Sequence, residues 1–179
     1  MRSSPATAEG PAVRSAQDAG AAAAYTETET ILALVAALAL VGALIHAGAA
    51  VDHWAEYHLY TFVFSGLAAL QVCWALLILR GASRRVLALG CVMQLGIVGL
   101  WLASRTVGVP LAPRAWTPEE IGIADLSETL GELMTVLAVA SVLLAERTRA
   151  VRAVRRWMPA TLLLAILISA LFGTGAHAG

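Results

Sequence analysis

Five long apolar runs constrain this chain more than any other feature of its sequence. They lie at about 30–50, 58–79, 85–105, 126–145 and 157–174. Each is close to the ~20 residues that an α-helix needs to cross ~30 Å of hydrocarbon. Alternating segments of about ten residues, which a transmembrane β-barrel requires, do not occur. We therefore expect an all-α fold, a polytopic transmembrane helical bundle with five spans.

The composition fits a surface that is covered by lipid. The 179 residues are 59% hydrophobic and 13% charged, whereas a soluble domain is about 45–50% apolar and about 25% charged. The formal net charge is zero, which gives no reason to expect a nucleic-acid partner. The expected partner is the lipid bilayer, and other membrane subunits or a second copy of the chain remain open.

The arginine residues predict the orientation of the spans. They cluster in the two connections that follow the second and fourth runs, at Arg80, Arg84, Arg85, Arg147, Arg149, Arg152, Arg155 and Arg156. Because cytoplasmic connections are enriched in Arg and Lys, both connections are expected in the cytoplasm of a multi-pass plasma-membrane protein. The N-terminal tail 1–29, which its composition predicts to be disordered, joins them. The 106–125 loop and the short 175–179 tail around His177 fall outside.

Residues 31–49 also allow a second interpretation, a cleaved signal peptide. Ala47-Gly48-Ala49 is typical of a small-residue cleavage site. The flank at 26–30 is acidic, however, where a signal peptide carries basic residues. Cleavage leaves four spans, and the uncleaved chain has five.

Two glutamines are predicted to meet within the membrane. Gln71 and Gln94 are equally distant from the turn between the second and third runs, so in an antiparallel pair of helices they lie at the same depth. An interhelical hydrogen bond of this kind contributes about 0.6–2 kcal/mol.

The remaining polar residues of the spans gather toward the outer side. His46, His53, Glu56 and Glu132 form a candidate set of metal ligands, and Arg105, Glu128 and Glu132 a candidate ion pair or proton path. Histidine nitrogens and carboxylate oxygens are ligands for divalent transition metals. His46 and His53 are ~10.5 Å apart along a straight helix, so one ion can take both only if the chain kinks near Gly48.

Three interpretations of this outer cluster stay open: a buried ion pair, a metal site and a proton or substrate path. Glu132 lies too deep to cap its helix, and Arg105 is the fixed cation at a comparable depth, so we expect the two to pair. The sequence has no His-Glu-x-x-His, Cys-x-x-Cys or Walker pattern and assigns no catalytic residue, which leaves enzymatic activity open. A divalent transition metal is compatible with these ligands, whereas haem is disfavoured because only His46 lies within a span.

The loop before the fourth span contains a helix-start pattern. Thr117-Pro118-Glu119-Glu120 resembles a capping box with proline at the first helical position, which predicts a short surface helix. Asp125 and Glu128 repeat the spacing at the start of the fourth span.

Several stretches resemble a family of small, uncharacterised multi-pass membrane proteins of high-GC bacteria. They are His46…His53-Trp54-Ala55-Glu56, Gln71-Val72-Cys73-Trp74-Ala75, Ser104-Arg105-Thr106-Val107-Gly108-Val109-Pro110 and Pro118-Glu119…Gly122…Asp125. The Ser-Arg-Thr-x-Gly-x-Pro stretch is the most specific, and the likeness spans residues 40–146. The resemblance implies a helical membrane fold and no established activity.

Reporter fusions test the predicted topology. A reporter inserted at residue 82 and one fused after residue 179 should report opposite sides of the membrane, because five spans separate the N-terminus from the C-terminus. Two reporters on the same side contradict five spans with this orientation.

Overall fold

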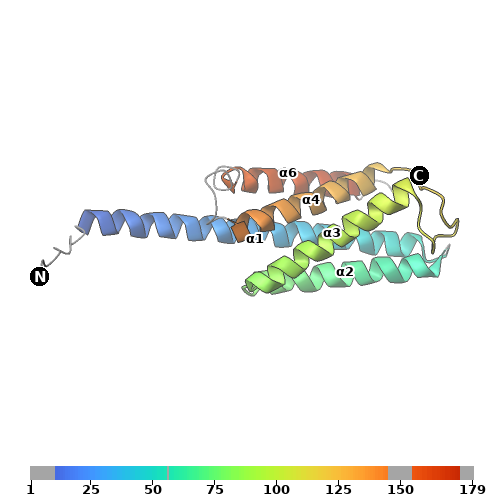
Figure 1. Cartoon of the computed structure of the whole chain (residues 1–179), viewed down its shortest axis with the longest axis horizontal. Helices are drawn as coiled ribbons and strands as arrows, with labels where there is room; N and C mark the ends of the chain where they lie inside the picture. The colour runs from blue at the N-terminus through green and yellow to red at the C-terminus, as the bar shows by residue number, and fades with distance from the viewer. Residues whose placement is uncertain (1–10, 56, 145–154, 174–179) are drawn as a thin grey trace, which may run out of the picture.

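The fold is a bundle of α-helices. A computed structural model describes residues 11–55, 57–144 and 155–173, and the regular structure in these ranges is helical. Its five helices are α1 (Pro11–Asp52), α2 (His58–Leu79), α3 (Arg84–Thr106), α4 (Ile123–Leu144) and α6 (Met158–Gly173) (Figure 1). The expected all-α class is confirmed.

Four of these helices are long and apolar enough to cross a membrane: α1, within Gln17–Asp52, and α2, α3 and α4. At ~1.5 Å per residue, the 22 or 23 residues of the last three span roughly 33 Å. Helix α6 is also apolar but has 16 residues, or roughly 24 Å. The fifth run is therefore helical but shorter than a typical span.

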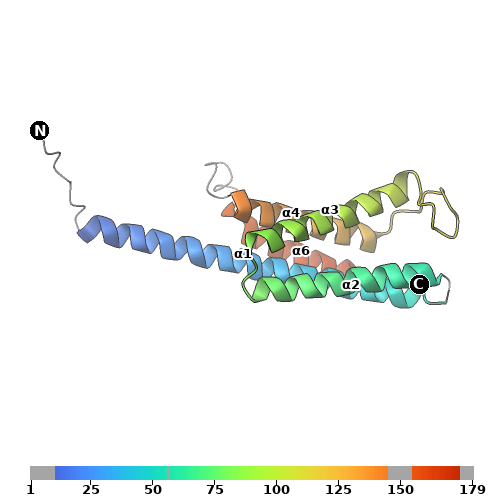
Figure 2. The same cartoon turned by 60° about the horizontal axis from the view of Figure 1, so that its bottom comes forward.

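Helix α1 begins much earlier than the apolar run that predicts it. It starts at Pro11 and contains 42 residues, so residues 11–29 are helical where composition predicts disorder. Alanine is the strongest helix former, and proline is favoured at a first helical position. Roughly 63 Å long, α1 extends well beyond the bundle at its N-terminal end (Figure 2). Residues 1–10 of the predicted tail lie outside the described ranges.

The bundle has an apolar exterior and polar groups inside. Phe62 is 69% exposed and Leu89 is 68% exposed, whereas Gln71 and Glu132 are 0% and 3% exposed. Water would penalise this distribution, but lipid covers apolar side chains without cost and penalises polar ones. The exposure pattern therefore supports the same conclusion as the length of the helices.

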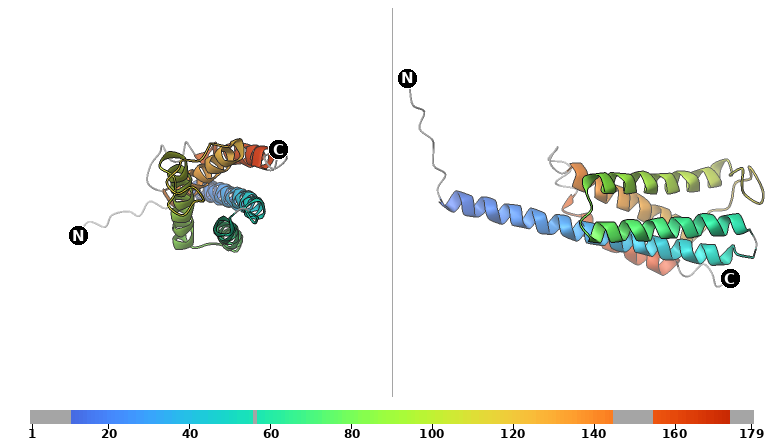
Figure 3. Two further views of the ribbon diagram at one scale, coloured as in Figure 1. Left: turned by 90° about the vertical axis from the view of Figure 1, so that its right-hand side faces the viewer. Right: turned by 90° about the horizontal axis from the view of Figure 1, so that it is seen from below.

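Helix α1 organises the bundle by packing against α2, α4 and α6. Helix α3 packs on α4 and diverges from α2 after the turn that joins them (Figure 3). The end of the bundle that contains this turn is called the Arg-rich end, and the end that contains residues 107–122 is called the loop end. The buried apolar core lies toward the Arg-rich end, with Ile31, Val35, Ala36, Leu38, Ala39, Trp74, Ala75, Ile78, Leu87, Ala138, Val139, Met158 and Leu162 as its members.

Arginines bind helix ends together at the Arg-rich end. Arg84 donates from Nη2 to the Leu143 carbonyl oxygen at 2.6 Å, which joins the start of α3 to the end of α4. Arg155, just before α6, donates to Thr28 Oγ1 and lies 3.5 Å from Glu27 Oε1 on α1. Arg84 and Arg155, the described arginines that make these contacts, thus lie at the same end of the bundle. The residues at 145–154 lie outside the described ranges.

Gly90 should be essential to the contact between α2 and α3. A Cβ atom at this position lies 1.9–2.2 Å from the indole of Trp74, whereas one at Gly96 meets nothing within 4 Å. Alanine favours a helix over glycine by about 1 kcal/mol, so Gly96→Ala should preserve or raise thermal stability in detergent. Gly90→Ala should destabilise the protein by about 1–3 kcal/mol through overpacking.

The double variant Trp74→Leu/Gly90→Ala provides the control, because it removes the clash. It should recover part of the stability that Gly90→Ala loses. Equal melting temperatures for Gly90→Ala and Gly96→Ala contradict this packing.

Candidate metal centre and polar network

One histidine and two glutamates converge in the loop-end half of the bundle. His46 on α1 directs Nε2 toward Oε1 of Glu128 at 3.1 Å and Oε1 of Glu132 at 3.7 Å. The two glutamates are four residues apart on α4 and therefore lie on one face of that helix. One ligand atom from each of the three residues lies within 4.8 Å of the others.

This three-residue group is buried and incompletely hydrogen-bonded. The side chains of His46, Glu128 and Glu132 are only 5%, 11% and 3% exposed. Both ring nitrogens of His46 and Oε1 of Glu128 lack a hydrogen-bond partner. The 3.1 Å contact between His46 Nε2 and Glu128 Oε1 is therefore close without being a hydrogen bond. Unpaired polar atoms in an apolar environment cost about 1–3 kcal/mol each. The group therefore calls for a proton, a cation or water.

Two amides extend the polar contacts from α4 to α2 and α3. Gln71 Nε2 lies 3.4 Å from both Oε1 of Gln94 and Oε1 of Glu132. The structure thus brings Gln71 and Gln94 together as the hairpin register predicts, and adds Glu132. Glycine at position 42 permits the close approach to α1, because a Cβ there lies 3.1 Å from Gln71 Nε2.

Only part of the metal-ligand set that the sequence suggests comes together. His46 and Glu132 belong to the three-residue group, and Glu128, assigned to the ion pair or proton path, completes it. His53 does not join them: α1 runs unbroken past Gly48 to Asp52, which leaves His53 beyond the helix. Its ring stacks on Phe64 with centroids 5.5 Å apart. Glu56 lies outside the described residues.

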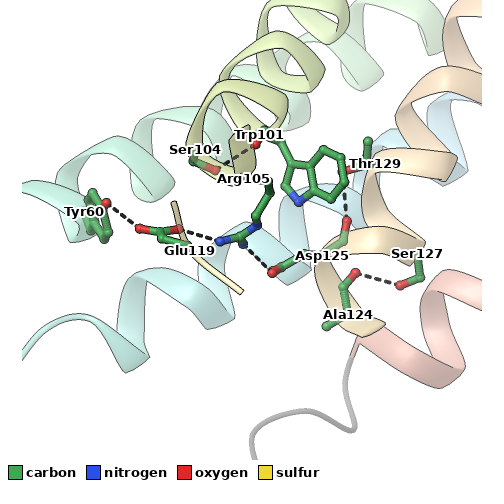
Figure 4. A network of polar contacts seen from close by, with 9 residues as sticks. All are labelled: Tyr60, Trp101, Ser104, Arg105, Glu119, Ala124, Asp125, Ser127 and Thr129. Atoms are coloured by element: carbon green, nitrogen blue, oxygen red, sulfur yellow. Dashed lines mark hydrogen bonds and ion pairs between the residues drawn. The ribbon is translucent and has the colours of Figure 1, made fainter. Parts of the chain in front are cut away.

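The Arg105 guanidinium is the centre of a separate network at the loop end. Nη1 lies 2.6 Å from Oε2 of Glu119 and Nη2 lies 2.5 Å from Oδ2 of Asp125 (Figure 4). Tyr60 donates from its hydroxyl to Oε1 of Glu119 at 2.8 Å. The ion pair predicted between Arg105 and Glu132 is therefore wrong: among the described residues, Arg105 pairs with these two acids, and Glu132 contacts His46 and Gln71.

The fold of the loop explains why Arg105 pairs with Glu119 and not with Glu132, the partner that the sequence predicts. Gly108 has φ +74°, and a Cβ there lies 2.5 Å from Thr117 N, so glycine lets the loop fold back on itself. The Glu119 amide then donates to the Ser104 carbonyl at 3.0 Å. The surface helix predicted after Thr117 is absent from this part of the described chain, because Glu119 ties the loop to α3.

A cavity of about 620 Å³ lies between the two polar groups. Its walls come from α1, α2, α3, α4 and the loop, and they include His46, Glu128 and Glu132 as well as Arg105 and Glu119. Most of its other lining residues are apolar or aromatic, such as Leu67, Leu100 and Phe64. The three-residue group therefore borders a space large enough for a small molecule.

Comparison with known proteins finds no family model that matches this chain, no curated protein that matches its sequence and no solved structure that matches its fold.

A double-mutant cycle distinguishes the two possible partners of Arg105. Arg105→Met combined with Asp125→Asn should show a coupling of about 1 kcal/mol, at the upper end for ion pairs that solvent partly screens, since the Asp125 side chain is 41% exposed. Arg105→Met combined with Glu132→Gln should be additive within about 0.5 kcal/mol. Thermal unfolding in detergent measures both. Larger coupling with Glu132 than with Asp125 contradicts the observed network.

Proposed function

We propose that this membrane protein binds one divalent transition-metal ion between His46, Glu128 and Glu132. The observation that carries the proposal is the spacing of the three ligand atoms. Bond lengths of about 2.0–2.2 Å to a tetrahedral ion place neighbouring ligand atoms roughly 3.3–3.6 Å apart. The distances from His46 Nε2 to the two carboxylate oxygens, 3.1 and 3.7 Å, lie on either side of that range.

Charge balance supports the same ion. When both are ionised to bind a metal, Glu128 and Glu132 carry two negative charges, and the cation Arg105 is already paired with Glu119 and Asp125. A divalent ion neutralises Glu128 and Glu132 completely, whereas burial of either carboxylate alone is costly in a bilayer. One nitrogen and two oxygen ligands suit Zn²⁺, Mn²⁺, Fe²⁺ or Co²⁺ better than soft copper(I).

The surroundings have the properties of a second coordination shell. Gln71 lies 3.4 Å from Glu132 Oε1 through its amide nitrogen, which fixes the direction of the ligating carboxylate. Such contacts orient metal ligands and tune their affinity. The apolar core at the Arg-rich end favours a binding site over an open path through the bundle. A proton-linked transporter or a non-catalytic accessory subunit remains the alternative proposal.

Metal titration of the purified protein tests the proposed site. His46→Ala and Glu132→Gln should each weaken Zn²⁺ or Co²⁺ binding by about 100-fold or more, because even outer-shell changes cost about 10–100-fold. Glu120→Gln is the matched control, since Glu120 is an exposed acid of the loop and should not change affinity. Calorimetry measures the affinity, and elemental analysis should give one ion per chain.

If His46→Ala leaves the affinity for Zn²⁺ or Co²⁺ as unchanged as Glu120→Gln does, the metal site is contradicted. The three residues would then serve as a proton carrier or as structural contacts between α1 and α4.

A further inference from the structure

The cavity is much larger than a metal ion requires. Its volume of about 620 Å³ falls within the range of roughly 300–1,000 Å³ that is typical of small-molecule sites. One water molecule occupies about 30 Å³ in the liquid. The space beside the proposed ion is therefore of the size that an organic molecule fills.

The protein provides three ligands rather than four. Structural zinc sites are closed by four protein ligands, whereas sites that act on a substrate keep one position open. Among the described residues, the group that could hold an ion is limited to His46, Glu128 and Glu132. Gln71 turns its amide nitrogen toward Glu132 and so acts on a ligand, not on the ion. All three ligands line the cavity, so the open position faces it.

The walls of the cavity select an apolar and partly aromatic molecule. The Phe64 ring stacks between His46 and His53, with centroids 5.8 and 5.5 Å from theirs. Leu67 and Leu100 contribute apolar surface from α2 and α3. An apolar body that leaves water or lipid for this space gains free energy in proportion to the area that it buries.

The charges at the site favour an uncharged head group. With a divalent ion bound, the two carboxylates are neutralised, and Arg105 already holds two acids. An anionic head would therefore bring uncompensated charge to membrane depth, where it is costly. A hydroxyl or carbonyl oxygen can occupy the open position without this cost.

We propose that the cavity binds a neutral, lipid-soluble molecule whose hydroxyl or carbonyl oxygen completes the coordination of the metal ion at His46, Glu128 and Glu132. This inference rests on the proposed function, because it requires the ion. It adds the class of ligand: an oxygen-donor head on an apolar body that fills the cavity.

Cobalt-loaded protein and a series of linear primary amides, from acetamide to hexanamide, test the inference. These probes stay uncharged when they bind, offer one carbonyl oxygen as donor and dissolve in water at chain lengths from two to six carbons. Binding at the open position should change the visible absorption of Co²⁺. Affinity should rise by up to about fourfold for each added methylene group, because each is buried in the cavity.

Two alanines of α1 provide a matched pair of variants. Ala49 lines the cavity, whereas Ala47 is exposed on the other side of the helix. Ala49→Phe should abolish the dependence on chain length and preserve the spectral response to acetamide. Ala47→Phe should behave like the unmodified protein. If Ala49→Phe does not fold, the chain-length series in the unmodified protein decides the question.

The failures of the two proposals can be distinguished. Cobalt that binds but does not respond to the amides overturns this inference alone. A spectral response with equal affinity for all chain lengths also overturns it, because the apolar body then gains nothing from the cavity. Absence of cobalt binding overturns the proposed function and this inference together.

Discussion

Ionisable groups that are buried at membrane depth must be neutralised, and this constraint accounts for the arrangement of the loop-end half of the bundle. Charged side chains within spans are costly unless they pair or bind ions. Arg105 meets the constraint with two acids, one from the loop and one from α4. His46, Glu128 and Glu132 have no such fixed partner cation among the described residues. This difference makes the group of His46, Glu128 and Glu132 a candidate binding site rather than a structural ion pair.

The polar and apolar halves of the bundle have different physical roles. At the Arg-rich end, close packing of apolar side chains from all five described helices forms a buried core. Close approach there depends on details such as the absence of a side chain at Gly90. Toward the loop end, α2 and α3 diverge and leave the cavity, with the Arg105 network joining the loop to α3 and α4. A closely packed half thus supports a half that has room for a ligand.

The fold could be predicted from the sequence because it follows from the length of the apolar runs. The depth of Gln71 and Gln94 followed from the antiparallel geometry of α2 and α3. The partner of Arg105 did not, because Glu119 lies in a loop whose return depends on a positive φ at Gly108, which no periodic pattern reveals. Likewise, the alanine-rich start of α1 was predicted to be disordered because it lacks an apolar face, although its intrinsic helix propensity is high.

The metal ligands, too, could be predicted only in part from the sequence. Residue type and depth place His46, His53 and Glu56 in one candidate ligand set, and the rise of a straight helix correctly separates His46 from His53. Which residue of α4 would face His46 depended on the rotation of one helix against another. The i, i+4 spacing of Glu128 and Glu132 was a signal for a shared face, and it could have placed Glu128 beside Glu132 among the ligands from the start.

The position of a bound ion in a crystal would decide whether His46, Glu128 and Glu132 form a metal site. Crystals of the protein grown with Zn²⁺ or Co²⁺ would give an anomalous difference map at the absorption edge of that metal. If the proposed site is correct, the map should show one strong peak about 2.0–2.2 Å from His46 Nε2 and from a carboxylate oxygen of each of Glu128 and Glu132. A map with no peak between these residues, or with its main peak at His53 or at the exposed His58, would contradict the proposed metal site.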